Sequence, residues 1–385
     1  MPNVLTPFIP SLAQDLDIVS RELVGFIPSV TRNTSAERAA VGQSVYVPVS
    51  RAQTSFNITP AMAIPEPADF TLDNVEMKIT KSKGVAFGMT GEEQRGLNTG
   101  VGSGAIVNGQ FAEALRTLVN EVEADLALEA AMHASRAYGS PGFTPFSSNV
   151  GDSAQVRKML DDNGAPATGR SLVIDTSAGA SLRTLQNLTR VNEAGTAMTL
   201  RDGELLNLNG LSIKESAQVV RPVIGTGAAT GDTTGVATAV GSTSIAVKAA
   251  GSGTILAGDY VSFAGDTNKY LVVEGIAALG SGGTLKIAAP GLRVALPAAE
   301  TEITVVARSV RNIGFSQNAL QLIARAPALP DGSDAAIDSA LLVDPRSGIP
   351  FEIRVYEAYR KRRYEVALAW GVKAIKDEHI VALLG

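Results

Sequence analysis

The feature that most restricts the fold is a continuous helical pattern over residues 108–138. The segment is rich in Ala, Leu and Glu, and Gly139 and Pro141 follow it and predict its end. A helix of about thirty residues is a rod of roughly 45 Å, longer than a small domain is wide. We therefore expect it to be the spine of the fold. Its apolar stripe consists of Phe111, Leu115, Leu118, Val122, Leu126 and Ala130.

A row of polar residues on the same helix suggests a carboxylate-rich metal site. Glu121, Asp125, Glu129 and His133 recur at every fourth residue. Di-metal helix bundles draw their ligands from several facing helices, with a Glu-x-x-His pair, and the sequence has no second long helix with such a pair. We therefore interpret the row as an acidic edge that faces solvent or a neighbouring subunit, and we expect no metal site.

The chain before this helix does not read as a compact domain. Residues 1–42 contain short apolar helical pieces that prolines interrupt, which is typical of an arm laid over another surface. Residues 43–95 contain an alternating segment, a proline-rich tip and an alternating return, which predict a long two-stranded loop. Two strands alone are marginally stable in water, so this loop needs a partner surface.

Residues 150–221 mix helix and strand signals and predict an α+β unit. A short helix ends at Gly164, a buried strand turns into a helix that starts near Ser177, and two strands join at Asn209 and Gly210. The stretch IDTSAGASL lacks the Gly-Lys-Ser/Thr ending of a phosphate-binding loop and the G-x-S-x-G spacing of a nucleophile elbow. We expect no catalytic or cofactor-binding residue here.

Composition excludes several further classes. The chain has no Cys, which excludes disulfide scaffolds, thiolate zinc sites and cysteine nucleophiles. A net charge of −5 over 385 residues predicts no general affinity for phosphate backbones. Neither end shows a secretory signal, and no run of about eighteen apolar residues occurs. We expect a soluble protein made in a cytoplasm.

Residues 222–309 differ from both flanks and predict an inserted β-barrel. They hold 14 of the 38 Gly, lack helical periodicity and contain short alternating runs between turn signals. Their five basic and six acidic residues nearly cancel, as suits a self-contained domain without a polyanion site. Its expected core residues are Tyr260, Val261, Phe263, Tyr270, Leu271 and Val273.

The C-terminal region predicts two strands joined by a basic turn. FEIRVYEAY is the first strand, and Tyr364, Val366, Leu368, Trp370 and Val372 line one face of the second. Over 351–365, five basic residues against three acidic ones give a net charge of +2. That balance favours cross-strand and intersubunit ion pairs over a nucleic-acid grip. The basic residues of the turn are Arg360, Lys361, Arg362 and Arg363.

The order of these elements resembles the major capsid proteins of tailed phages with the HK97-type fold, in particular the P22-like coat protein group. The segment VALAWGVKAIKDEHIVALL is similar to the group's apolar strand, aromatic residue next to Gly-Val, and last short helix. GDYVSFAGDTNKYLVVEG is similar to a stretch of its inserted barrel, although the barrel here, about 88 residues, is shorter than is usual for the group.

The resemblance implies an α+β, HK97-like capsid fold with an inserted small β-barrel. Its expected parts are an N-terminal arm (1–42), an extended loop (43–95), the spine helix and peripheral domain (96–149), an axial domain (150–221), the barrel (222–309), and a return to the axial and peripheral domains with closing strands (310–385).

The implied function is that of a coat protein that self-assembles into the icosahedral shell around a tailed phage's double-stranded DNA. Its expected partners are other copies in pentamers and hexamers, a scaffolding protein and a portal; DNA contact would be weak and non-specific, and no membrane or cofactor is implied. The location is the virion, after assembly in the host cytoplasm. Expected intersubunit contacts are Met62, Ile64 and Phe70 at the loop tip and Arg360 to Arg363.

Two alternatives stay open. An encapsulin-like nanocompartment shell shares the fold but holds protein cargo, and the inserted barrel argues against it. A metal-dependent enzyme would use the acidic edge of the long helix. We expect a structural protein and not an enzyme.

Overall fold

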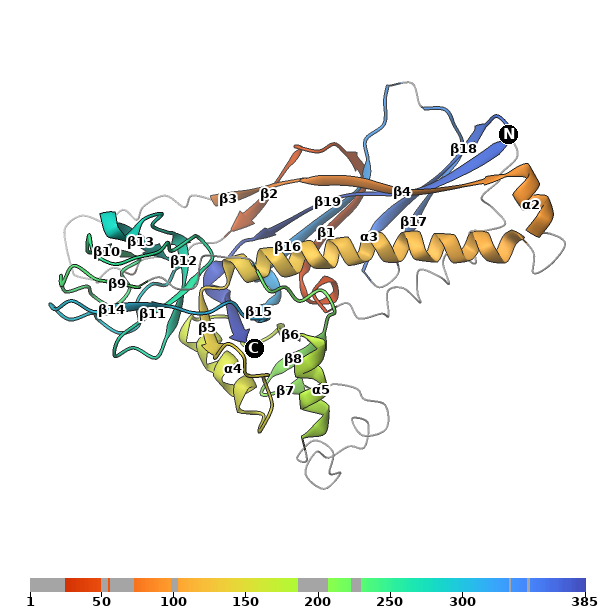
Figure 1. Ribbon diagram of the computed structural model, residues 1–385. Helices are drawn as coiled ribbons and strands as arrows, with labels where there is room; N and C mark the ends of the chain where they lie inside the picture. Colours follow the sequence, from red (N-terminus) through yellow and green to blue (C-terminus); the bar gives the residue numbers. More distant parts are fainter. Residues whose placement is uncertain are drawn as a thin grey trace, which may run out of the picture.

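The computed structural model describes residues 25–49, 55, 73–97, 103–185, 207–222, 230–331, 334–344 and 347–385. It contains a long helix, α3 (Ser103–His133), that lies along a six-stranded sheet, and a second, larger sheet at one end of this layer (Figure 1). The chain therefore mixes helices with large sheets, as the α+β expectation requires.

The six-stranded sheet gathers strands from both ends of the chain. Its path is β1 (Thr31–Ala39), β16 (Leu320–Pro327), β19 (Lys361–Ala374), β18 (Pro350–Ala358) and β17 (Ala336–Val343), and β4 (Lys81–Thr90) pairs with β19. The 14 residues of β19 span about 46 Å and the 31 residues of α3 about the same. The two longest elements thus have matching lengths.

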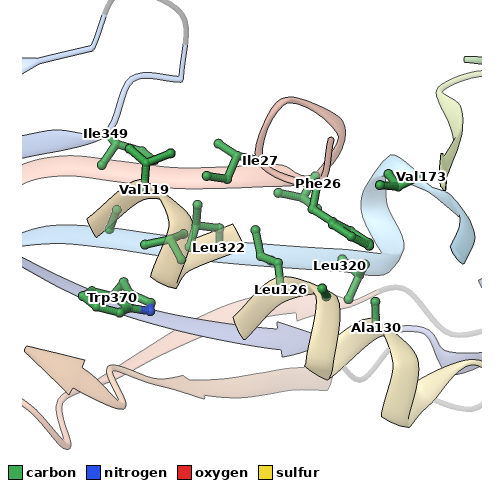
Figure 2. Packing of buried hydrophobic residues seen from close by; sticks show 14 of the residues in the cluster. Phe26, Ile27, Val119, Leu126, Ala130, Val173, Leu320, Leu322, Ile349 and Trp370 are labelled. Atoms are coloured by element: carbon green, nitrogen blue, oxygen red, sulfur yellow. The ribbon is translucent and has the colours of Figure 1, made fainter. Parts of the chain in front are cut away.

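Strand β19 has the predicted two faces. Tyr364, Val366, Leu368 and Trp370 join the main hydrophobic core with α3, while Ala369 packs into a separate cluster on the other face. Figure 2 shows side chains of α3, of the sheet and of the segment at residues 26–27 meeting in one apolar layer. The alternation alone was sufficient to predict this arrangement.

Helix α3 is shifted relative to the prediction. It begins at Ser103 and ends at His133, whereas the pattern suggested 108–138. The last predicted residues form β5 (Arg136–Gly139), because their backbone groups pair with β20 and β12. Strand pairing therefore ends the helix before Gly139 does.

The second sheet is 12-stranded and contains the C-terminus. Its path runs β7 (Asn207–Leu208), β8 (Leu211–Glu215), β6 (Arg170–Ile174), β15 (Arg311–Ser316), β20 (Ile380–Leu384), β5, β12 (Lys269–Glu274), β11 (Tyr260–Phe263), β14 (Glu302–Val305) and β9 (Thr230–Asp232). Off this path, β10 (Ser244–Val247) pairs with β13 (Gly283–Ile287), and β13 pairs with β12.

The expected last short helix is wrong. Only a three-residue 3₁₀ turn, Asp377–His379, precedes β20, and the segment IVALL is a strand. All five of its residues are buried, and β15 and β5 flank it on both edges. A central strand satisfies its backbone groups through both neighbours, so five apolar residues suffice for it.

The elements predicted within residues 150–185 and 207–221 are largely confirmed. Helix α4 (Gly151–Asp162) is followed by Gly164 at φ 75°, and β7 and β8 join through Asn209 and Gly210, both at positive φ. Helix α5 (Thr176–Thr184) begins after Asp175, whose carboxylate accepts from the backbone N–H of Ser177 and Ala178. Asp175, and not Ser177, is therefore the N-cap.

Strands β9 to β14 form a closed ring. Their order is β9, β14, β11, β12, β13, β10, and an antiparallel bridge between Thr233 and Val247 returns from β10 to the end of β9. A hydrophobic cluster drawn only from residues 245–305 fills this region.

The ring's core differs in part from the predicted one. Val261, Phe263 and Tyr270 belong to its cluster, but Tyr260 and Leu271 belong to the main core. Val273 is 54% exposed. Since β12 also pairs with β5, the ring is attached to the body, and the side chains nearest the attachment turn toward that body.

Residues 222–309 are expected to fold when expressed alone. The ring closes on itself and has its own cluster, so the segment should give dispersed amide resonances and a cooperative melt, with a stability of a few kcal/mol. Substituting Tyr260 with Gln should leave the isolated segment folded, because Tyr260 packs on the rest of the chain. A random-coil spectrum of the isolated segment would show that these strands need the parent sheet.

Candidate functional site

The acidic edge of α3 contacts strands of its own chain. Glu121 pairs with Lys83 at 2.6 Å, and Asp125 pairs with Lys81 at 2.7 Å. Asp125 also accepts from Trp370 Nε1 at 2.8 Å. The interpretation of this row as a face for solvent or a neighbour is therefore wrong. It fixes the helix along β4 and β19.

The end of the same row anchors the C-terminal segment. Glu129 accepts from the backbone N–H of Ala374 at 3.0 Å, and His133 Nδ1 lies 3.2 Å from Asp377 Oδ1. The hydrogen bond with Asp377 raises the pKa of His133, against the effect of burial. Within the described ranges, no group of three or more His, Asp or Glu side chains is arranged to hold a metal ion.

A second carboxylate on α3 holds the base of the N-terminal arm. Glu123 is fully buried and accepts three backbone hydrogen bonds, from Gly25 at 2.6 Å, Phe26 at 2.7 Å and Ile27 at 3.0 Å. Burial raises the pKa of Glu123, and these hydrogen bonds oppose the rise. A Cβ at Gly25 would lie 2.6 Å from Val173 Cγ1, so this close approach requires glycine.

Glu123 was missed in the sequence although a signal was present. It lies four residues after Val119 and three before Leu126, both buried, and so falls on the apolar face of the helix. A charged residue on such a face needs a buried partner. The sequence could not reveal that the partner is a backbone turn almost one hundred residues earlier.

The predicted extended loop contains an antiparallel pair, β2 (Ser44–Val49) with β3 (Asp73–Lys78), which we call the ribbon. Its base packs on the sheet face opposite α3, where Met77 joins Ile323 and Ala369. A Cβ at Gly371 would lie 2.1 Å from Lys78 O, so the ribbon base touches the β19 backbone. The tip residues Met62, Ile64 and Phe70 lie outside the described residues.

The ribbon is shorter than predicted. Residues 81–90 leave it as β4 and pair along β19 from Lys361 to Trp370. Alternation reads the same in both pairings, so it could not show where the strand changes partner.

The four basic candidates lie at the far end of this sheet, away from the second sheet (Figure 1). Arg360, at φ 54°, occupies the β18–β19 turn, and the other three begin β19. Arg362 pairs with Glu357 across the strands, and Arg363 pairs with Glu365, both at 3.1 Å. Two of the four thus have ion partners in their own chain. Contact of any of the four with another subunit stays a prediction.

A partly buried ion network connects the arm to the closing strands. Arg38 of β1 contacts Glu352 of β18 at 2.6 Å, and Arg354 Nε contacts the same carboxylate at 2.8 Å. Burial opposes ionisation of Glu352, but the hydrogen bonds from Arg38 and Arg354 outweigh it and lower the pKa of Glu352. Arg354 also pairs with Asp334, which accepts from Tyr356 Oη at 2.9 Å.

The ring of β9 to β14 joins the spine helix through a cation at the helix end. Arg311 donates to the carbonyls of Ala131 and Gly258, both at 2.7 Å, and its guanidinium lies 4.5 Å from the Tyr260 ring centroid. Tyr260 Oη donates to Ala134 O at 2.9 Å, and burial raises the pKa of Tyr260 to about 12. Positive charge at a helix C-terminus is stabilising.

None of the described helices combines the length and apolar character needed to cross a membrane.

Replacing Arg360, Lys361, Arg362 and Arg363 together with Gln is expected to impair assembly and to leave duplex DNA binding unchanged. Exposed ion pairs contribute about 1 kcal/mol or less each, so the unfolding free energy should fall only slightly. Filter binding at several salt concentrations would test the expectation for DNA binding. One result would contradict the expectation: the wild type binds duplex DNA and the variant does not, and the logarithm of the wild-type affinity falls by about 0.9 per phosphate contact for each tenfold rise in salt.

No protein-family model matches the sequence, and no curated protein matches it. Several solved structures are similar to the chain. The capsid of cyanophage P-SCSP1u is 11% identical, over 94% of this chain and 88% of its own, at a TM-score of 0.48. A structure from Mycobacterium phage Che8 is 14% identical over 90% and 85%, at 0.44. A virus-like particle from Pyrococcus furiosus is 11% identical over 98% and 99%, at 0.43. Identities and TM-scores this low do not transfer a function.

Proposed function

We propose that this chain is the major capsid protein of a tailed phage, with an HK97-like fold, and that its copies assemble into an icosahedral shell around double-stranded DNA. In this proposal α3 and the six-stranded sheet are the peripheral domain, the second sheet with α4 and α5 is the axial domain, and the ring of β9 to β14 is the inserted barrel. The role is structural, and the proposal includes no catalytic centre.

The observation that supports the proposal is the elongated layer of one helix on one sheet. A helix is about 10 Å across and strands lie about 4.8 Å apart, so α3 covers roughly two strands. The edge strand β17 is accordingly only half-buried, with Leu341 and Val343 exposed at 44% and 52%. An extended, incompletely covered layer suits a subunit whose neighbours complete it.

Three features at separate places on the layer fit the same role. The arm base is fixed by Glu123, the ribbon leaves the opposite face with Tyr46 63% exposed, and the distal turn carries Tyr359 at 89% exposed. A subunit in a closed shell contacts several neighbours at once and needs several separate surfaces.

Sedimentation of the purified chain tests the proposal, with the scaffolding protein of the same phage present. We expect particles far heavier than the 39.9 kDa monomer. Compact monomers only, at high concentration and with the scaffold present, would contradict it.

A further inference from the structure

An open groove lies at the distal end of the layer, between α2 (Gly91–Leu97) and the β18–β19 turn. Its volume is about 820 Å³. One wall is formed by residues 89–92 and 94 and the other by residues 357–362. The backbone N–H of Gly91 donates to Arg360 O at 3.2 Å and holds the two walls together at the base. Figure 1 shows α2 beyond the end of the sheet, on the side away from the second sheet. We call this feature the distal groove.

The two walls carry opposite charges that are not used within the chain. Glu92 is exposed on the α2 wall and Arg360 on the turn wall, and in the part of the chain that the structure describes neither makes an ion pair. Their neighbours are engaged: Glu93 accepts from the backbone N–H of Thr90 at 2.8 Å, as in a capping box, and Glu357 pairs with Arg362. Among the described residues, the charges without an ion pair are therefore Glu92 on the α2 wall and Arg360 and Lys361 on the turn wall.

Beside Arg360 lies the most exposed large apolar side chain of the described residues, Tyr359 at 89%. The Arg360 guanidinium lies 5.5 Å from the Tyr359 ring centroid, so the two side chains project together. Tyr and Arg are the residue types that most often anchor protein interfaces. An exposed aromatic side chain on a tight turn is a preformed knob.

We propose that the Tyr359–Arg360 knob of one copy enters the distal groove of a second copy, with Arg360 against Glu92. This inference rests on the proposed function and names one contact through which shell subunits meet. Tyr359 and Arg360 line the groove of their own chain, so both copies contribute the same end of the layer to the contact.

The occupant is protein and not nucleic acid, because the groove carries charges of both signs. Its lining includes two acidic side chains, Glu92 and Glu357, and three basic ones, Arg360, Lys361 and Arg362. A phosphate backbone would meet negative as well as positive groups. A second copy offers Arg360 to Glu92.

Charge exchange tests the contact in the full chain. Arg360→Glu and Glu92→Arg are each expected to raise the concentration needed for half-assembly about tenfold, and the double variant should return to within about threefold of wild type. Lys158→Glu, on the exposed side of α4, is the matched control and should assemble as wild type. Melting of each unassembled variant checks that the monomer is intact. Singles that assemble normally, or a double variant no better than the singles, overturn the inference while shells still form.

The absence of Cys gives a second test. Chains carrying Arg360→Cys and chains carrying Glu92→Cys are mixed and oxidised after assembly. A disulfide between the two kinds of chain is expected in assembled particles and not in monomers; its absence from well-formed particles overturns the inference. If wild-type chains never assemble with scaffold, the proposed function fails instead, and this inference with it.

Discussion

The Glu123→Ala variant will lose about 3 kcal/mol or more of unfolding free energy. Three buried backbone N–H groups lose their acceptor, and an unsatisfied buried donor costs about 1–3 kcal/mol. The gain from no longer burying a carboxylate offsets part of that sum, as the raised pKa of Glu123 indicates. Denaturant unfolding of the monomer measures the difference.

Glu113→Ala is the matched control, because Glu113 lies on the same helix with its side chain 63% exposed. Surface changes of this kind stay within about 0.5 kcal/mol. Equal losses in the two variants would show that the turn at residues 25–27 contributes nothing to stability. A larger loss at Glu123, with assembly impaired as well, would place the arm base among the elements that shell formation requires.

Charged substitutions at Met62, Ile64 and Phe70 will abolish assembly and leave the monomer's melting temperature nearly unchanged. The ribbon is two strands wide, and a two-stranded element is too small to bury three further large apolar side chains by itself. We expect these side chains to rest on an adjacent subunit, where Asp in their place would put unpaired charges into an apolar contact.

A variant with Leu at all three positions controls for the change of side chain and should still assemble. Sedimentation reports assembly, and circular dichroism reports the melt of the unassembled chain. An early melt of the charged variant would mean that the loop tip packs within its own chain.

The elements that could be predicted from the sequence are those that local chemistry decides. The alternation of β19 placed Trp370 on the core face, and Asn209–Gly210 fixed a tight turn because both residues accept positive φ. The position of Arg360 in a turn followed from the two strands around it. In each case the deciding residues are neighbours in sequence.

The elements that were missed depend on partners far away in sequence. Strand β20 is a strand because β15 and β5 flank it, and α3 ends at His133 because β5 pairs instead. The ion pair of Arg38 with Glu352 joins residues 314 positions apart. The distal groove combines both cases. The β18–β19 turn could be predicted, but helix α2 beside it was not, and so the groove between them was missed.

Electron microscopy of the overexpressed chain, with and without its scaffolding protein, tests the central claim most directly. The proposal predicts closed, uniform icosahedral shells with scaffold, in which each subunit's density contains a long helix on a sheet. A homogeneous population of isolated subunits under both conditions, with no curved or closed polymer, would contradict it.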